Sequence, residues 1–147
     1  MRIERVNKFI LDHFHNYDKN IFFGEYEGRI GVSDGFIIFF IDPKDFPFDT
    51  EKFSNVNNYD FGKVIGDANE YRPGKKTGAL RYLDKGNAVE ISRLSDTTRA
   101  WVNEKYLKYF DIDCCFVIKK YNAPVLVYED SKLVGLIMPV RMKDEEV

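Results

Sequence analysis

The stretch Phe36-Ile37-Ile38-Phe39-Phe40-Ile41 decides which folds are open to this chain. Its aromatic and β-branched side chains predict a strand, but apolar and polar residues do not alternate along it. Such a strand carries apolar side chains on both of its faces. We therefore expect either that both faces are covered within the protein or that one face meets another protein.

Two turns place this strand at the end of a three-strand antiparallel meander. Glu27-Gly28 and Asp34-Gly35 are turn dipeptides between short β-rich runs, and glycine in second place reaches positive φ at no steric cost. They predict strands near residues 21–26, 29–33 and 36–41. An amphipathic helix over about residues 3–14 precedes them, because its apolar residues follow three-and-four spacing: Ile3, Val6, Phe9, Ile10 and Phe14.

The C-terminal part of the chain has the same order of elements. Asn103 is placed to cap a short helix that ends near Phe110, and strands are predicted near residues 114–119, 124–128 and 133–138. We therefore predict an α+β fold, built as two helix-plus-antiparallel-strand repeats over about residues 1–60 and 79–142. Both repeats belong to a single domain of residues 1–147.

The segment between the repeats is poorly patterned. Residues 42–78 contain three prolines and four glycines, and they predict little more than one short helix near Thr50 to Val56. Lys75 and Lys76 are expected in a glycine-flanked loop. A hairpin of strands near residues 79–83 and 88–94 follows this segment.

Composition favours one compact domain. The chain has 147 residues, of which 44% are hydrophobic and 31% charged, with a formal net charge of −2. It is therefore no polycation that would coat nucleic acid or anionic lipid, although residues 61–109 carry ten basic and six acidic side chains. No apolar run is long enough for a membrane span, and residues 1–12 do not resemble a secretory leader, so we expect a cytoplasmic protein with no membrane partner.

The residues show no nucleophile beside a base. Gly74-Lys75-Lys76-Thr77 lacks the first glycine and the final Ser or Thr of a phosphate-binding loop. Cys114 and Cys115 are adjacent in a predicted strand and so point to opposite faces, which favours one or two core thiols in a reducing compartment. We therefore predict no catalytic residue, no cofactor and no enzyme. An acid pair assembled by folding, and hence an unrecognised enzyme, stays as an alternative.

Two residue pairs were weighed as metal ligands. His13 and His15 lie two apart, which places them on different faces of a helix. Asp111 and Asp113 fall between a predicted helix and strand, where a solvated turn is the ordinary explanation. We therefore predict no metal site.

Three C-terminal segments together resemble the end of a bacterial DNA sliding clamp, the processivity clamp of DNA polymerase. They are the asparagine-led helix Asn103-Glu-Lys-Tyr-Leu-Lys-Tyr-Phe110, the strand Ala123-Pro-Val-Leu-Val-Tyr128 and the closing Leu136-Ile-Met-Pro-Val-Arg141, within roughly 45 residues. The resemblance implies a DNA clamp-like domain whose helices line a channel. A ring would then require a homo-oligomer of this single-domain protein. The resemblance implies a short clamp-like protein of the kind expected in phage or prophage regions of AT-rich bacterial genomes, and the excess of Lys over Arg with many Asn and Ile is typical of AT-rich codons.

The resemblance implies a non-enzymatic protein of DNA replication or repair that contacts double-stranded DNA. The cations of the two predicted helices would meet phosphates, namely Arg5, Lys8, Lys105 and Lys108. Lys75 and Lys76 would add a further contact. The alternative is that these side chains are only solvated, since acidic residues share the helix faces.

The resemblance also implies a partner-binding groove near the end of the chain. Met138, Pro139 and Arg141 match the clamp residues that grip peptides of replication or repair proteins. Methionine suits such a groove because its flexible thioether repacks around different partners. Alternatively, Met138 is core and Pro139 ends an edge strand. A protein-interaction module that does not bind DNA is therefore the second functional hypothesis.

Overall fold

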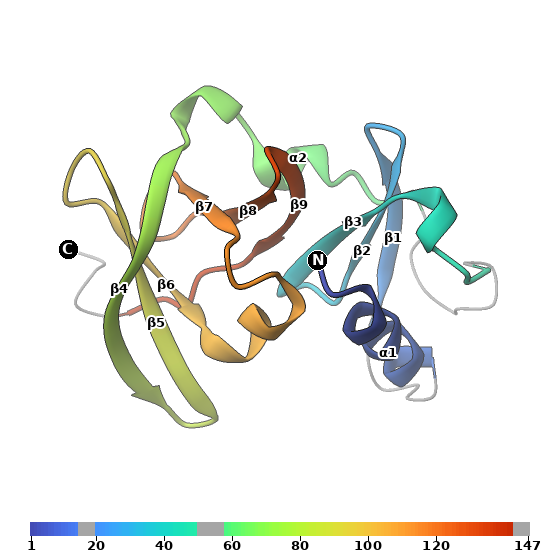
Figure 1. Cartoon of the computed structure of the whole chain (residues 1–147), viewed down its shortest axis with the longest axis horizontal. Coiled ribbons are helices and arrows are strands. Elements are labelled where there is room, and N and C mark those ends of the chain that lie inside the picture. Colours follow the sequence, from blue (N-terminus) through green and yellow to red (C-terminus); the bar gives the residue numbers. More distant parts are fainter. Residues whose placement is uncertain (15–19, 50–57, 143–147) are drawn as a thin grey trace.

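Nine strands form one antiparallel sheet in the order β1-β2-β3-β9-β8-β7-β4-β5-β6, shown in Figure 1. The computed structural model describes residues 1–14, 20–49 and 58–142. The strands are β1 (Phe22–Tyr26), β2 (Arg29–Ser33), β3 (Ile37–Ile41), β4 (Arg72–Leu83), β5 (Gly86–Arg93), β6 (Arg99–Asn103), β7 (Cys115–Ile118), β8 (Val125–Glu129) and β9 (Lys132–Ile137). The helices are α1 (Ile3–Phe14) and α2 (Gly62–Ile65), with 3-10 turns η1 (Pro43–Asp45), η3 (Ala68–Glu70) and η4 (Glu104–Tyr109).

The predicted α+β fold, a DNA clamp-like domain of two helix-plus-antiparallel-strand repeats, is wrong. Over the described residues, the protein is mostly one nine-stranded sheet with little helix. Strands β4, β5 and β6 extend the sheet from β7, whereas only a hairpin was expected there. The first half of β4 has the polar sequence Arg-Pro-Gly-Lys-Lys-Thr and is exposed, so no apolar alternation marks it as a strand.

Several local predictions are confirmed. The helix covers Ile3–Phe14, and both three-strand meanders form near their predicted positions. The meanders join through β3 and β9, where Phe39 lies opposite Gly135. The second predicted helix is the 3-10 helix η4, and the Asn103 side chain caps it by accepting a hydrogen bond from the Lys105 amide at 3.1 Å. The helix predicted near Thr50 to Val56 lies outside the described residues.

Strand β3 is buried on both faces, which is the first of the two arrangements expected for its sequence. All five residues of Ile37–Ile41 are buried. Ile37, Phe39 and Ile41 belong to one hydrophobic core, whereas Ile38 and Phe40 belong to a second core on the opposite face. The two cores share this strand, so the sheet is the middle layer of the molecule.

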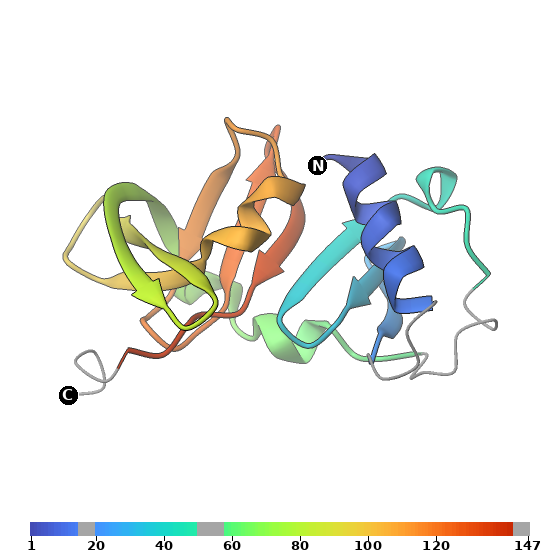
Figure 2. The same ribbon diagram turned by 90° about the horizontal axis from the view of Figure 1, so that it is seen from below.

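Each core has its own helical cover. Helix α1 and η4 pack on the face that holds the first core, and α2 packs on the other face (Figures 1 and 2). On each face a phenylalanine ring sits on a glycine of the sheet. A Cβ atom on Gly135 would lie 2.9 Å from the Phe110 ring, and one on Gly31 would collide with Phe61. Both glycines therefore let a covering segment approach the strands closely.

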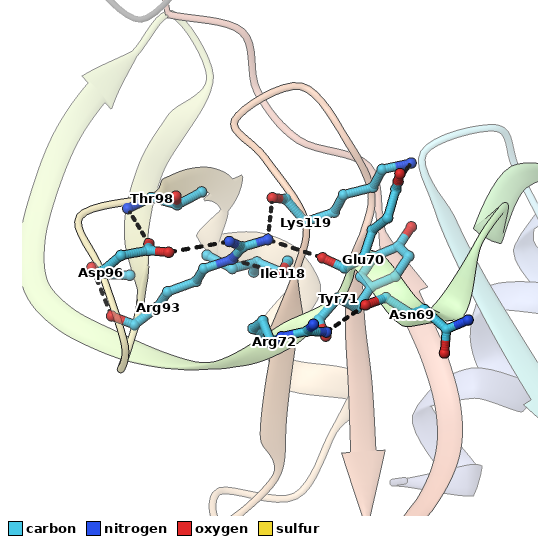
Figure 3. A network of polar contacts seen from close by, with 10 residues as sticks. Asn69, Glu70, Tyr71, Arg72, Arg93, Asp96, Thr98, Ile118 and Lys119 are labelled. Atoms are coloured by element: carbon cyan, nitrogen blue, oxygen red, sulfur yellow. Dashed lines mark hydrogen bonds and ion pairs between the residues drawn. The ribbon is translucent and has the colours of Figure 1, made fainter.

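Arg93 ties the β4–β6 end of the sheet to its neighbours (Figure 3). Its guanidinium donates hydrogen bonds to the carbonyl oxygens of Ile118 at 3.2 Å and of Glu70 at 2.9 Å, and also to that of Lys119. It forms an ion pair with Asp96 at 3.2 Å as well. One planar cation thus satisfies carbonyl groups from two chain segments outside its own strand.

We predict that Phe39→Ala lowers the free energy of unfolding by about 3–5 kcal/mol, because it opens a cavity in the core beneath α1 and η4. Phe36→Ala is the matched control, since Phe36 is 61% exposed. It should change stability by less than about 1 kcal/mol. Urea unfolding followed by circular dichroism measures both. Equal effects of the two substitutions would contradict the double burial of β3.

Asp96 should make stability depend on acid pH. The Thr98 amide donates a hydrogen bond to its carboxylate at 2.7 Å, and this bond, the Thr98 hydroxyl and Arg93 lower the pKa of Asp96 from 3.8. A lowered carboxyl pKa stabilises the fold above the unfolded-state pKa, and the gain is lost as the pH falls through the folded-state value. We therefore expect Asp96→Asn to be less stable than wild type at pH 7 and the difference to shrink as the pH falls below 3.8. Thermal unfolding across pH measures the difference in stability between the two proteins. A difference that is unchanged in acid would contradict this assignment.

Candidate functional site

A groove of about 820 Å³ opens between α1, η4, the β2–β3 turn and the segment that follows β9. This volume is within the range of sites that bind ligands or short peptide side chains. The residues that line the groove are Phe9, Asp12, His13, Asn20, Asp34, Phe36, Leu83, Asn103, Lys105, Tyr106, Lys108, Tyr109, Met138, Pro139 and Val140. They come from segments that are far apart in the chain but adjacent in the fold.

The apolar part of the groove is fixed by the backbone. The Phe36 carbonyl accepts a hydrogen bond from the Met138 amide at 2.8 Å, which extends the β3–β9 pairing by one step. The Val140 amide donates to the Trp101 carbonyl at 2.7 Å, so the chain after β9 is held at both ends of Pro139. Phe36 keeps an exposed ring beside this fixed segment. The groove therefore presents apolar surface on a rigid support.

Two lysines stand at the aromatic wall of the groove. The Lys105 ammonium lies 5.0 Å from the centroid of the Tyr106 ring, and that of Lys108 lies 5.2 Å from the Tyr109 ring. These distances are typical of cation–π contacts. Among the residues that the structure describes, neither ammonium has an acidic side chain as an ion-pair partner. Both lysines can therefore receive a negative group from a ligand.

Burial raises the pKa values of two tyrosines of the groove. Burial and, to a lesser degree, the nearby Asp34 carboxylate raise the pKa of Tyr106 to about 12. The pKa of Tyr109 is also raised, mainly by burial and then by Asp34 and Asp12. At neutral pH both phenols are hydrogen-bonding groups and not bases. The arrangement favours binding chemistry over proton abstraction.

Two other polar residues of the groove have structural roles. One Asp34 carboxylate oxygen accepts hydrogen bonds from the amides of Phe36 at 2.9 Å and Ile37 at 3.2 Å, which shapes the turn before β3. His13 is buried, and its Nδ1 donates to the Phe9 carbonyl oxygen at 2.7 Å, within the helix. His15 lies outside the described residues.

The predicted partner-binding residues are only partly brought together. Met138 and Pro139 line the groove, and Met138 also packs against the second core. The alternative that Met138 packs in the core is therefore confirmed in part, and peptide binding by Met138 and Pro139 stays a prediction. Arg141 is exposed and does not line the groove.

The predicted DNA-contacting cations do not form one surface. Lys105 and Lys108 line the groove, and the Arg5 guanidinium donates a hydrogen bond to the Lys108 carbonyl at 2.8 Å. Lys75 and Lys76 were expected in a loop, but they lie in β4 and line a separate hollow of about 380 Å³. Lys8 is exposed on α1. Contact of these side chains with DNA stays a prediction.

The cysteines and aspartates considered for chemistry have ordinary environments. Cys115 is exposed, so of the one or two core thiols predicted only Cys114 is left, which is half-buried with its pKa raised chiefly by burial. Asp111 forms an ion pair with the Met1 ammonium at 3.4 Å. Over residues 1–14, 20–49 and 58–142, no group of three or more His, Cys, Asp or Glu side chains is placed to hold a metal ion.

Sequence patterns missed the aromatic part of the groove. Phe36 was included in an apolar run expected to be covered, yet its ring is exposed because it precedes the first paired residue of β3. Tyr106 was identified only as part of the asparagine-led helix of residues 103–110. The signal that remained was the alternation of Lys and Tyr in Lys105-Tyr106 and Lys108-Tyr109, which places a cation beside each ring.

Comparison with protein-family models, curated proteins and solved structures found no match for this chain. In the described part of the chain, no helix has the length and apolar character needed to cross a membrane. The functional argument therefore depends on the groove itself.

Proposed function

We propose that this protein is a non-catalytic protein-interaction module that binds a short peptide segment of a partner protein in the groove. The segment combines an apolar side chain with acidic neighbours. The apolar side chain packs between Phe36 and the Met138-Pro139 segment, and the acidic groups face Lys105 and Lys108. The exposed Phe36 ring beside this backbone-fixed apolar segment is the observation that carries the proposal.

The apolar contact supplies the affinity. An aromatic ring that is 61% exposed inside a concave surface leaves apolar area in water that a ligand can cover. A methionine next to it adapts to side chains of different shape. Because the supporting segment is hydrogen-bonded on both sides of Pro139, little ordering cost accompanies binding.

The lysines supply the preference for an acidic segment. Their ammonium groups are oriented by the Tyr106 and Tyr109 rings, so both positive charges are presented at defined positions. Charges at the rim of an interface mainly increase the association rate and select among partners. We therefore expect binding to weaken with added salt but not to disappear, because the apolar contact is insensitive to screening.

Selection of peptides against the protein tests this function. Random short peptides displayed on phage are selected on the wild-type protein, and the enriched sequence is synthesised and titrated by fluorescence anisotropy. We expect an aromatic or large aliphatic residue beside Asp or Glu. Phe36→Ser should weaken binding at least about tenfold, and the double variant Lys105→Glu, Lys108→Glu should weaken it comparably.

Ile112→Ser is the matched control, because Ile112 is 89% exposed but does not line the groove. It should bind like wild type. Equal losses in Phe36→Ser and Ile112→Ser would contradict the location of the site. Tight, steeply salt-dependent binding of duplex DNA that Arg5→Glu, Lys8→Glu, Lys105→Glu and Lys108→Glu together abolish, with no peptide enriched, would favour the DNA-contacting function instead.

A further inference from the structure

We propose that β4 presents an open sheet edge that binds an extended acidic segment of a partner protein as an additional strand. This site differs from the groove and does not depend on the function proposed for it. Addition of a strand to an exposed edge is an established mode of peptide recognition, in which main-chain hydrogen bonds give affinity and side chains give selectivity.

The edge is open because β4 extends beyond the end of β7. Strand β4 pairs with β7 only over Arg72–Gly74, whereas its pairing with β5 continues to Leu83. Beyond Gly74, the side of β4 that faces away from β5 therefore has no neighbouring strand in the described part of the chain. The length of β4 relative to β7 is visible in Figure 1.

Unlike the free side of β4, both outer strands of the sheet are covered by a neighbouring segment. At the β1 edge, the Tyr59 amide donates a hydrogen bond to the Phe23 carbonyl at 2.8 Å. At the β6 edge, the Val140 amide donates to the Trp101 carbonyl at 2.7 Å. Proteins commonly protect edges by covering them in this way. Among the described residues, no backbone hydrogen bond from a neighbouring segment covers the free side of β4 in this way.

Strand geometry shows which backbone groups face outward. Leu83 and Gly86 close a two-residue turn, so their backbone groups point at each other across β4 and β5. Because the direction alternates along a strand, the N–H and C=O groups of Tyr82 and Leu80 point away from β5. The side chains are exposed as well, to 91% for Tyr82 and 53% for Leu80. The stretch Leu80–Leu83 therefore offers both backbone groups and apolar side chains.

An irregularity in β4 limits the stretch Leu80–Leu83 at its N-terminal end. The register of β4 against β5 shifts between Lys76 and Leu80, and Gly78 has a φ of +91°. The Thr77 hydroxyl donates to Glu90 at 2.8 Å and accepts from the Ala79 amide at 3.2 Å, which fixes this bulge. Bulges interrupt ladder pairing. A bound strand is therefore expected to pair from Leu80 toward Leu83, with Lys75 and Lys76 beyond the bulge near its end.

Charge selects the occupant. Strand β4 carries four basic side chains and no acidic one: Arg72, Lys75, Lys76 and Arg81. A second copy of this chain paired at the same edge would bring like charges together, which is unfavourable across strands. An acidic extended segment of another protein instead complements them.

A strand-forming probe tests the edge. We would titrate the full-length protein with a labelled peptide of alternating valine and glutamate and measure fluorescence anisotropy. Its counterpart with alternate amides N-methylated has the same charges but has lost the donors of one edge. We expect the unmodified peptide to bind and the methylated peptide, and one of alternating valine and lysine, to bind at least about tenfold more weakly.

Tyr82→Pro removes an outward N–H that β5 does not use, so the hydrogen bonds of Arg81 and Leu83 to β5 remain and the strand should still form. Circular dichroism and thermal unfolding verify folding, and Tyr82→Ala, which keeps the N–H, is the second variant. We expect Tyr82→Pro to lose binding and Tyr82→Ala to retain most of it. Lys76→Glu should weaken binding, while Lys44→Glu, which changes charge outside β4, should not.

Three results of the peptide-binding experiment would overturn the proposal. They are no binding of the valine–glutamate peptide by the wild type, equal binding of the methylated peptide, and unchanged binding by a folded Tyr82→Pro variant. A dimer in light scattering that Tyr82→Pro dissociates would also overturn it, because the edge would then take a second copy. Phe36→Ser leaves this edge intact, so failure of the groove and failure of the edge are distinguishable.

Discussion

The rest of the structure depends on the burial of both faces of β3. A strand whose five residues are all apolar cannot lie on the surface of a two-layer protein, so covering segments must pack on each side. Helix α1 and η4 cover one face, and Phe61 with α2 covers the other. Neighbouring strands then satisfy its backbone, and β9 brings the C-terminal meander alongside. The groove follows from this arrangement, because the segments that flank its apolar part are the ends of β3 and β9.

Apolar patterning predicted the parts of the fold that bury one regular face. Helix Ile3–Phe14 and the strands of both meanders were identified because three-and-four spacing or glycine turns mark them. The first half of β4 was missed because Lys75 and Lys76 are exposed on a strand that packs little apolar surface there. Strand β6 was missed because Arg99–Asn103 is short and follows directly on a polar turn. The predicted fold class was therefore wrong. The order of elements that the two halves share does not show which strands the segment between them adds to the sheet.

Only part of the groove could be predicted from the sequence. Met138 and Pro139 were singled out by resemblance, and the structure places both in the groove. Phe36 was not recognised as a surface residue. Its position relative to the first paired residue of β3 is set by the tertiary register, and the apolar run that contains Phe36 does not reveal that register. The assembly of α1, η4 and the chain after β9 around one hollow is likewise long-range. The two binding surfaces that we propose differ in their physical character: one is an apolar groove with oriented lysines, and the other is a basic sheet edge.

Native-state hydrogen exchange of backbone amides, followed by NMR, tests the account most directly. If β3 is the doubly buried centre, the amides of Ile37–Ile41 exchange only through global unfolding and belong to the slowest group, together with paired amides of β8 and β9. The amides of Leu80 and Tyr82 exchange rapidly at the open edge, while the neighbouring Arg81 and Leu83 are protected by β5. Fast exchange in β3, or equal protection of all four β4 amides, would contradict the account.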